Sequence, residues 1–396
     1  MQKKSHKSAG WIALFDGGMD VRPALTEQQL PGIPAKRGVA LLLSAEGEPV
    51  VLLPGANMRS RIRARLQRAD EEKHGRMPDL SKVTARVLWK LTSGHFETDL
   101  HYLELAWSIW PGGYASLLAW KEAWFVHVDT KDRFGHFQRT RKVFASRGSY
   151  IGPLATARLA DRFIGDLQDA FELCRNPSLG KLAPNAPTCT YGQMGKCLSP
   201  CDGRISLADY NRVVAKAADF AAGHRGPAVA ELKKAMSDAA ESLRFEQAAA
   251  VKSRLQKLDE LSSSAFAHVA SAEEFRFILV QRGASFRQAK VFLVDRGHVA
   301  EADPLDYPLG TDQARRTLER MADHVRAGRA WDDVCRWRMA LVARYLDSSD
   351  RRKGLMLRWR AGMSVAELTE AVAAAAGLLG LRLPGRKAKK AADGDS

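Results

Sequence analysis

The chain has few cysteines and no long apolar run. Five cysteines in 396 residues are too few for a disulfide scaffold, so hydrophobic cores must hold the fold. The most apolar late stretch, residues 371–381, is far shorter than the roughly 20 residues that cross a bilayer. Asp16 and Asp20 interrupt the short apolar run near the start, which argues against a secretory signal. We therefore expect a soluble, cytoplasmic protein with no membrane segment.

Acidic residues are in the minority, and this is the strongest compositional signal. The chain has 61 lysines and arginines against 45 acidic residues, which gives a net charge of +16. Each cation that neutralises a phosphate releases condensed counterions, so nucleic acid is the partner that this charge favours. The alternative is that the charge only aids solubility or sits in tails such as residues 386–390.

The first part of the chain predicts a β-hairpin that leads into a basic helix. Two apolar runs, Val39 to Leu43 and Val50 to Leu53, flank the turn sequence SAEGEP. After them, Met58, Ile62 and Leu66 recur at every fourth position, which predicts a helix with a narrow apolar stripe. The other faces of this helix carry five arginines: Arg59, Arg61, Arg63, Arg65 and Arg68.

Further elements make the chain an α+β protein. Strands are predicted at Val87 to Leu91 and Phe125 to Val128, with a helix from Phe96 to Ile109 between them. Two more helices are predicted, at residues 155–174 and 206–222.

The second half predicts helices around one more β-hairpin. Residues 230–261 form a long helical run that should bend into an antiparallel pair near Ser242 to Phe245. A hairpin follows at residues 276–294, and residues 312–359 are expected to be helical. This last region interleaves arginines with Trp331, Trp337 and Trp359, so it is either an ordinary helical bundle or a second DNA surface whose aromatic rings stack on bases.

Four cysteines gather in one local region. Cys189, Cys197 and Cys201 lie within thirteen residues, and fourteen residues separate Cys174 from Cys189. Four thiols satisfy an iron–sulfur cluster or a structural zinc. The sequence lacks the paired C-x-x-C knuckles of zinc ribbons, so the spacing favours iron–sulfur, while zinc and unliganded thiols remain open. The fifth cysteine, Cys335, is interpreted as a packing residue.

The order of these motifs resembles a known family. Cys174, the stretch CTYGQMGKCLSPCDGRIS and the helical run AAESLRFEQAAAVKSRLQKL follow one another as in UvrC, the bacterial excision-repair endonuclease subunit. The missing carboxyl half makes the chain more similar to Cho, the shortened homologue. The resemblance implies a 4Fe–4S cluster on Cys174, Cys189, Cys197 and Cys201. It also implies a UVR motif that docks on a UvrB-like protein through Leu243, Phe245, Glu246 and Ala249.

The resemblance further implies a division into parts. It predicts an N-terminal extension (1–34), a GIY-YIG-like nuclease domain (35–150), a linker with the cysteine cluster (151–225), a UVR-like helical hairpin (226–262), a β-hairpin with an Arg-rich helical region (263–384) and a disordered basic tail (385–396).

The nuclease chemistry of that family looks degenerate here. Ala40 and Val51 stand where the resemblance places the two tyrosines, and Pro54 stands where it places a lysine. Arg61 keeps the position of the catalytic arginine. Tyr102 occupies the position of the metal-binding glutamate, and a tyrosine is a poor ligand for Mg²⁺. An alignment shifted by two residues would restore Glu104 as the ligand.

The sequence is compatible with three functions. The first is a repair protein that binds DNA through the helix from Arg59 to Arg68 and recruits a UvrB-like partner, with impaired endonuclease activity. The second is an active, divergent endonuclease that depends on Mg²⁺ or Mn²⁺ and uses Glu97, Asp99 or Glu104. The third is a UVR-motif adaptor with no role on DNA, which the basic charge disfavours.

Overall fold

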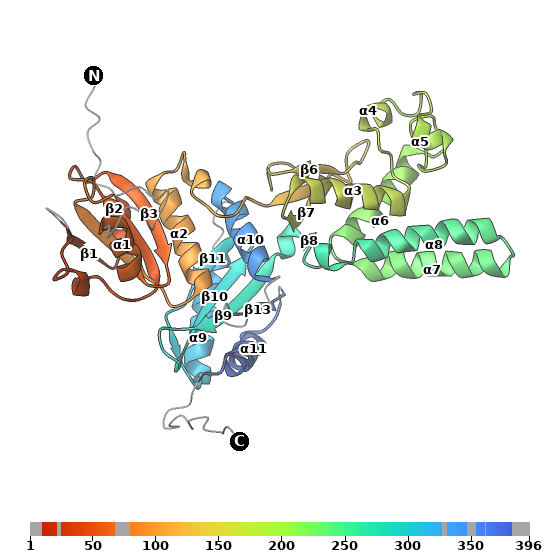
Figure 1. Cartoon of the computed structure of the whole chain (residues 1–396). Helices are drawn as coiled ribbons and strands as arrows, with labels where there is room; N and C mark the ends of the chain where they lie inside the picture. The colour runs from red at the N-terminus through yellow and green to blue at the C-terminus, as the bar shows by residue number, and fades with distance from the viewer. Residues whose placement is uncertain are drawn as a thin grey trace, which may run out of the picture.

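The computed structural model of the chain describes residues 10–21, 25–67, 80–326, 331–346, 354–360 and 362–381. Within these residues the fold combines helices with three antiparallel sheets, so the predicted α+β class is confirmed. Figure 1 shows the first and third sheets close together at one end of an elongated molecule, with a helical hairpin extending from the other end. The basic tail and Arg68 lie outside the described residues. No helix in the described part is long and apolar enough to span a membrane.

The first sheet contains the predicted β-hairpin at its centre and edge. Its strand order is β1 (Gly17–Asp20), β4 (Arg86–Leu91), β2 (Gly38–Leu43) and β3 (Pro49–Gly55). The turn between β2 and β3 places Gly47 at φ +80°, a conformation that favours glycine. Strand β1 comes from the segment predicted as an extension, so that segment is partly built into the sheet.

Two helices cover opposite faces of this sheet. Because side chains alternate along a strand, Ala40 and Leu42 of β2 pack on one face and Val39 and Leu41 on the other. The first face meets α1 (Met58–Leu66), and the second meets α2 (His95–Ile109). Asn57 caps α1 by accepting a hydrogen bond from the Ser60 amide.

The second sheet starts inside the predicted nuclease domain. Its order is β6 (Gln138–Thr140), β5 (Trp124–Val128), β7 (Ser149–Leu154) and β8 (Ala270–Ser271). Since β5 pairs with β7 and not with the first sheet, the predicted boundary at residue 150 falls within one strand pair. The helices around this sheet and the cysteine loop are α3 (Ala157–Phe171), α4 (Pro177–Gly180), α5 (Thr190–Gln193) and α6 (Leu207–Ala221).

The long helical run forms a hairpin of two helices. Helix α7 (Arg225–Glu241) and helix α8 (Phe245–Glu260) pack side by side, and the chain turns at Ser242 to Arg244 as predicted (Figure 1). Leu243 sits at the turn with φ +58°. The base of α8 is fixed to α3, because Arg254 donates to the Ala170 carbonyl at 2.7 Å.

The third sheet holds the carboxyl-terminal part together. Its order is β11 (His298–Glu301), β10 (Gln288–Asp295), β9 (Arg276–Arg282) and β13 (Leu355–Arg358), and β12 (Leu305–Asp306) also pairs with β10. Helices α9 (Thr311–Arg326) and α11 (Val365–Leu378) cover one face. Helix α10 (Asp333–Leu346) packs on the other face beside α2. The expectation of helix throughout residues 312–359 is wrong at β13.

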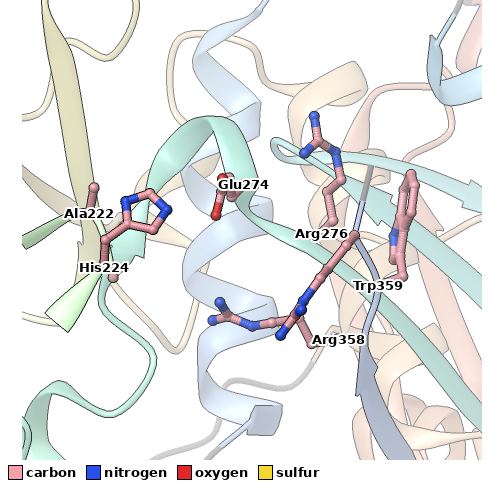
Figure 2. Close-up of a pocket in the computed structure, with 8 residues that line it drawn as sticks. Ala222, His224, Glu274, Arg276, Arg358 and Trp359 are labelled. Carbon is pink, nitrogen blue, oxygen red and sulfur yellow. The ribbon is translucent and has the colours of Figure 1, made fainter. Parts of the chain in front are cut away.

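Short 3₁₀ turns connect several of these elements. The turns span Gly10–Leu14, Leu30–Gly32, Tyr114–Ser116, Ser264–Phe266 and Ala272–Glu274. A pocket of about 440 Å³ lies between the base of the helical hairpin and the third sheet (Figure 2).

The first and third sheets share one hydrophobic core. Val39 and Leu41 of β2, Phe96 of α2, Phe292 of β10 and Leu341 of α10 all belong to it. The rings of Phe96 and Phe292 meet edge to face, with centroids 5.1 Å apart. These two parts therefore form one packed body, although the sequence predicted them as separate domains.

Buried charges also cross this joint. The Nζ of Lys290 on β10 lies 2.6 Å from Glu301 and 3.6 Å from Glu97 of α2. His101 of α2 contacts the other oxygen of Glu301 at 3.1 Å. Burial alone would raise the pKa of Glu301, but hydrogen bonds from His101 and Lys290 outweigh it and lower the pKa to about 2. One cation thus holds two carboxylates from different parts of the chain.

Replacing Lys290 with methionine tests this joint. The variant leaves two facing carboxylates without their buried cation, so we expect the free energy of unfolding to fall by about 3 kcal/mol at pH 7. A carboxylate with a lowered pKa stabilises the folded state above its unfolded pKa of 4.5, and the contribution is lost as the pH falls towards 2. Urea unfolding at pH 7 and pH 3 should therefore show a smaller difference between wild type and variant at pH 3. An equal difference at both values would contradict this role.

Candidate functional site: a basic helix and a four-cysteine loop

The hairpin of the first sheet carries no ionisable group at the positions singled out in the sequence. Ala40 is fully buried and pairs with Leu53. Val51 pairs with Leu42, and Pro54 pairs with Val39. Aliphatic side chains at these positions can neither take a proton from water nor hold a phosphate, so the hairpin offers packing and no acid or base.

The four described arginines of the basic helix differ in their environments. Arg59 donates to the carbonyls of Ile33 at 2.8 Å and Pro31 at 3.1 Å, so it ties a preceding loop to α1. Arg63 pairs with Glu27 at 2.7 Å, with both side chains largely exposed. These two guanidinium groups already have partners within the chain.

Arg61 and Arg65 are the members of this set with unbalanced charge. Neither forms an ion pair with a described residue, and the Nε of Arg61 is buried without a hydrogen-bond partner. Partial burial and the nearby charge of Arg61 lower the pKa of Arg65. Two neighbouring guanidinium groups without a described counter-charge are suited to an anion.

The hydroxyl of Tyr102 is engaged by the backbone. This hydroxyl donates to the carbonyl of Leu117 at 3.1 Å, and burial raises its pKa, so the phenol stays protonated. Tyr102 lies on α2, which covers the face of the sheet opposite to α1. Tyr102 and Arg61 therefore project from helices on opposite faces of the sheet.

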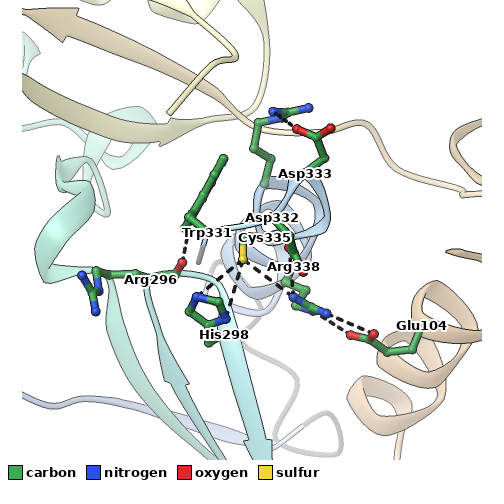
Figure 3. Close-up of polar contacts among 9 residues, drawn as sticks. Glu104, Arg296, His298, Trp331, Asp332, Asp333, Cys335 and Arg338 are labelled. Atoms are coloured by element: carbon green, nitrogen blue, oxygen red, sulfur yellow. Dashed lines mark hydrogen bonds and ion pairs between the residues drawn. The ribbon is translucent and has the colours of Figure 1, made fainter. Parts of the chain in front are cut away.

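Glu104 is bound to Arg338, as Figure 3 shows. Both of its oxygens accept hydrogen bonds from Arg338 of α10, at 2.6 and 3.1 Å. Arg338 is mostly buried and also approaches Asp332 at 3.4 Å. A bidentate pair of this kind engages both oxygens and neutralises the carboxylate. The alternative that Glu104 is a free metal ligand is therefore not supported by its contacts.

The remaining acidic residues of α2 are also engaged. Asp99 accepts a hydrogen bond from the hydroxyl of Tyr345 at 2.8 Å, and burial raises its pKa. Glu97, His101 and Glu301 bring three ligand atoms within 4.8 Å of one another, which is a spacing that suits a divalent ion. Lys290 already supplies the positive charge between the two carboxylates, so an ion would have to displace its ammonium group.

The four cysteines of the predicted cluster converge. Cys174 ends the loop after α3, Cys189 caps α5, and Cys197 and Cys201 lie in the loop before α6. The thiols of Cys174 and Cys197 are hydrogen-bonded to each other, which raises the pKa of Cys174 and lowers that of Cys197 to about 6. Burial raises the pKa of Cys201, and the charges of Cys189 and Cys197 act on it in the same direction. Cys174, Cys197 and Cys201 therefore influence one another, and Cys189 acts on Cys201.

Backbone groups and a buried tyrosine support this loop. The Ser199 amide donates to the Cys197 sulfur at 3.3 Å, and the Cys174 amide donates to the Tyr210 hydroxyl at 3.2 Å. Tyr210 stacks on Phe134 with ring centroids 5.2 Å apart. The loop is therefore built to present sulfur ligands, and soft thiolates suit iron–sulfur clusters or zinc.

Cys335 stands apart from this group. It is fully buried in α10, and burial raises the pKa of its thiol to about 12. Its sulfur lies 3.9 Å from His298 and 3.7 Å from Arg338 (Figure 3). A neutral, enclosed thiol is a packing group, in line with the interpretation of this cysteine from the sequence.

The tip of the helical hairpin exposes large apolar side chains. Leu243 is 73% exposed and Phe245 is 66% exposed. Glu246 and Ala249 on the first turns of α8 are exposed beside them. The four residues singled out for partner binding therefore share one solvent-facing tip.

The interleaved tryptophans are not available to stack on bases. Trp337 and Trp359 are buried, and the indole of Trp359 donates to the Val294 carbonyl at 3.1 Å. Trp331 is partly buried and donates to the Arg296 carbonyl at 2.9 Å. The stacking alternative is therefore wrong for these rings, which fill the core around the third sheet.

The sequence did not indicate which residues pair with the carboxylates of α2. Lys290, Tyr345 and Arg338 lie roughly 200 residues beyond the carboxylates that they contact. Each stands in an ordinary strand or helix pattern, so the sequence holds no local signal for these pairs. The arginines around the pocket of Figure 2 were likewise not singled out as a group.

Comparison with known proteins agrees with this architecture. Residues 123–220 match the sequence model described as the middle domain of UvrC/Cho excinuclease. This range begins at β5 and ends within α6, so it contains the four-cysteine loop. It also supports a domain boundary near residue 123, ahead of the predicted one.

Curated relatives extend the similarity to both sides. The UvrABC system protein C of Moorella thermoacetica is 26% identical over 279 residues, which is 70% of this chain and 44% of that protein. That of Syntrophomonas wolfei is 27% identical over 299 residues, 73% of this chain and 48% of the relative. That of Novosphingobium aromaticivorans is 36% identical over 132 residues, 33% and 20% of the two chains.

These matches confirm the resemblance to UvrC/Cho-type proteins that was found in the sequence. The chain spans less than half the length of the relatives that it matches. No solved structure matches it significantly.

Proposed function

We propose that this protein acts in nucleotide excision repair as a DNA-binding UvrC/Cho-type subunit whose GIY-YIG-like first unit does not cleave DNA efficiently. The observation that carries the proposal is that the acidic side chains of α2 are already bonded to other residues. Its carboxylates at Glu97, Asp99 and Glu104 bond to Lys290, Tyr345 and Arg338, so none is free beside Arg61. Hydrolysis of a phosphodiester at a metal site needs such a ligand.

DNA binding is supported by charge. The chain carries a net charge of +16, and Arg61 and Arg65 project from α1 without a described acidic partner. In this proposal they hold the phosphate backbone, which gives affinity without base recognition. Arg59 and Arg63 shape the surface around them.

The cysteine loop is proposed to hold an iron–sulfur cluster. Cys174, Cys189, Cys197 and Cys201 supply four thiols, and the lowered pKa of Cys197 favours the thiolate that such a cluster binds. The cluster would order the segment between α3 and α6. Zinc is the alternative occupant.

The helical hairpin is proposed to be a UVR-like module that docks on a UvrB-like protein. Its apolar tip at Leu243 and Phe245 extends away from the rest of the molecule (Figure 1). Exposed leucine and phenylalanine side chains at a protruding turn are costly in water unless a partner covers them.

A second candidate is a divergent nuclease with a rearranged metal site. The grouping of Glu97, His101 and Glu301 favours it, and Lys290 disfavours it because its ammonium already neutralises two of these groups. Both candidates require DNA binding, whereas an adaptor without a DNA role does not.

Incubation of the protein with supercoiled plasmid and Mn²⁺ or Mg²⁺ tests the proposal directly. We expect salt-dependent retention of the DNA in a shift assay and no nicking above the level of an Arg61→Ala variant. The variant should bind more weakly, with the slope of log K against log salt reduced by about one.

Nicking by the wild type that is lost in Glu97→Gln would favour the rearranged metal site instead. Absence of salt-dependent binding would favour the adaptor.

Metal analysis of anaerobically purified protein tests the cluster. We expect about four iron atoms per chain and a visible absorption band that disappears in Cys197→Ser. Cys335→Ser is the matched control and should keep the iron, because Cys335 lies in a separate core. Stoichiometric zinc would replace the iron–sulfur proposal, and absence of both metals would refute the site.

The double substitution Leu243→Ala with Phe245→Ala tests the hairpin tip. Both side chains are largely exposed, so stability should hold while affinity for a purified UvrB protein falls at least roughly ten-fold. Leu378→Ala, which removes an apolar side chain that is 60% exposed on α11, is the control. Equal affinity of the tip variant and the control in calorimetry would rule out this docking mode.

A further inference from the structure

The pocket shown in Figure 2 is assembled from two distant parts of the chain. Gly223 and His224 line it from the turn that leads into α7, and Arg276 of β9 and Arg358 of β13 line it from the third sheet. Glu274 lies between these two walls in the view. The volume of the pocket is about 440 Å³, and Trp359 and Arg360 complete its wall on the side of the third sheet.

Positive charge in this pocket exceeds the negative charge that faces it. Arg276 is paired with the buried Asp295 at 3.1 Å. Arg358 and Arg360 are exposed and form no ion pair with a described residue. Glu274 is the carboxylate among the lining residues, so two guanidinium groups and one carboxylate remain without described ion pairs.

Arg225 adds a third guanidinium group behind Arg358. It donates to the carbonyls of Phe266 at 3.3 Å and Val269 at 3.4 Å, and these neutral groups leave its charge uncompensated. Burial and the charge of Arg358 lower the pKa of Arg225. Like charges held this close to each other are stabilised by an anion placed between them.

The start of α7 contributes to the same side of the pocket. This helix has 17 residues, no side-chain cap on its first turn and no acidic residue there. Its unpaired amide groups and its dipole favour a negative charge at this end. His224, which precedes the helix, is paired with Asp219 at 2.9 Å and adds little charge of its own.

The walls are suited to a phosphate and not to a base. Trp359 is 3% exposed and its indole is bonded to a backbone carbonyl, so the indole ring is not open for stacking. Arg358 lies over the ring of Phe277, with its guanidinium carbon 5.3 Å from the centroid. This contact orients the charged group at the rim.

We infer that this pocket binds a backbone phosphate of DNA and so guides the strand across the joint between the helical hairpin and the third sheet. The inference rests on the proposed DNA-binding function and adds a second contact, remote from α1. A polymeric ligand is favoured over a free phosphate because the unpaired arginines are exposed at the rim, and the whole chain is strongly cationic.

The double substitution Arg358→Gln with Arg360→Gln tests the inference in the full chain. Fluorescence anisotropy with a labelled duplex of about 30 base pairs and with the corresponding single strand would be measured from about 50 to about 300 mM salt. We expect affinity to fall roughly ten-fold at low salt and the slope of log K against log salt to drop by about 1.8, since each lost phosphate contact removes about 0.9.

Two variants serve as controls. Arg158→Gln removes an exposed arginine of α3 that forms no described ion pair, and it should change the slope little. The pair Arg358→Lys with Arg360→Lys keeps both charges but alters the packing on Phe277, and it should retain the wild-type slope.

The outcomes separate the pocket from the proposed function. One outcome is that the wild type binds DNA in a salt-dependent way while the glutamine pair keeps the same slope of log K against log salt. That result would overturn the inference about the pocket and leave the proposed function standing. No binding by the wild type would overturn the proposed function as well. A lysine pair as weak as the glutamine pair would assign the effect to packing and overturn the inference. Calorimetric binding of inorganic pyrophosphate that is lost in the glutamine pair, with DNA affinity unchanged, would identify a small-anion site instead.

Discussion

The structure depends on the use of α2 as a shared element between two sheets. One side of this helix packs on the hairpin of the first sheet, and another meets β10 and α10 of the third. Burying a carboxylate is costly unless a cation or a donor compensates it. Glu97 meets Lys290, Asp99 meets the Tyr345 hydroxyl and Glu104 meets Arg338. The helix that resembles the metal-binding helix of a nuclease is therefore committed to holding the molecule together.

A single residue, Glu172, connects the cysteine loop with the helical hairpin. Glu172 follows α3, and its carbonyl accepts a hydrogen bond from the Leu198 amide of the cysteine loop at 3.0 Å. Its carboxylate pairs with Arg254 of α8 at 3.0 Å. One residue thus contacts both the cysteine loop and the base of the hairpin. The order of the loop and the direction in which the hairpin projects are therefore coupled through Glu172.

Local sequence patterns predicted most helices and strands, but they did not predict the contacts between residues far apart in the chain. The hairpin of β2 and β3, helix α1 and the bend at Ser242 to Arg244 follow from short-range periodicity and turn residues, and the structure has them where expected. Strand β13 was missed because the four residues Leu355–Arg358 show no clear alternation and are strand only through pairing with β9. The convergence of four thiols could be predicted since they are close in sequence. The partners of Glu97 and Glu104 could not, because only the tertiary fold brings them together.

Position 40, where the resemblance places a tyrosine, lies in the core of the first sheet and not at its surface. Ala40 is fully buried and packs in one cluster with Met58, Ile62 and Leu53. A tyrosine ring at this position would have to displace those side chains, and overpacking of this kind costs about 1–3 kcal/mol or more. The basic helix α1 lies on that same cluster, so its packing now depends on the small residue at position 40. The geometry therefore couples the positions of Arg61 and Arg65 on α1 to the small residue at position 40.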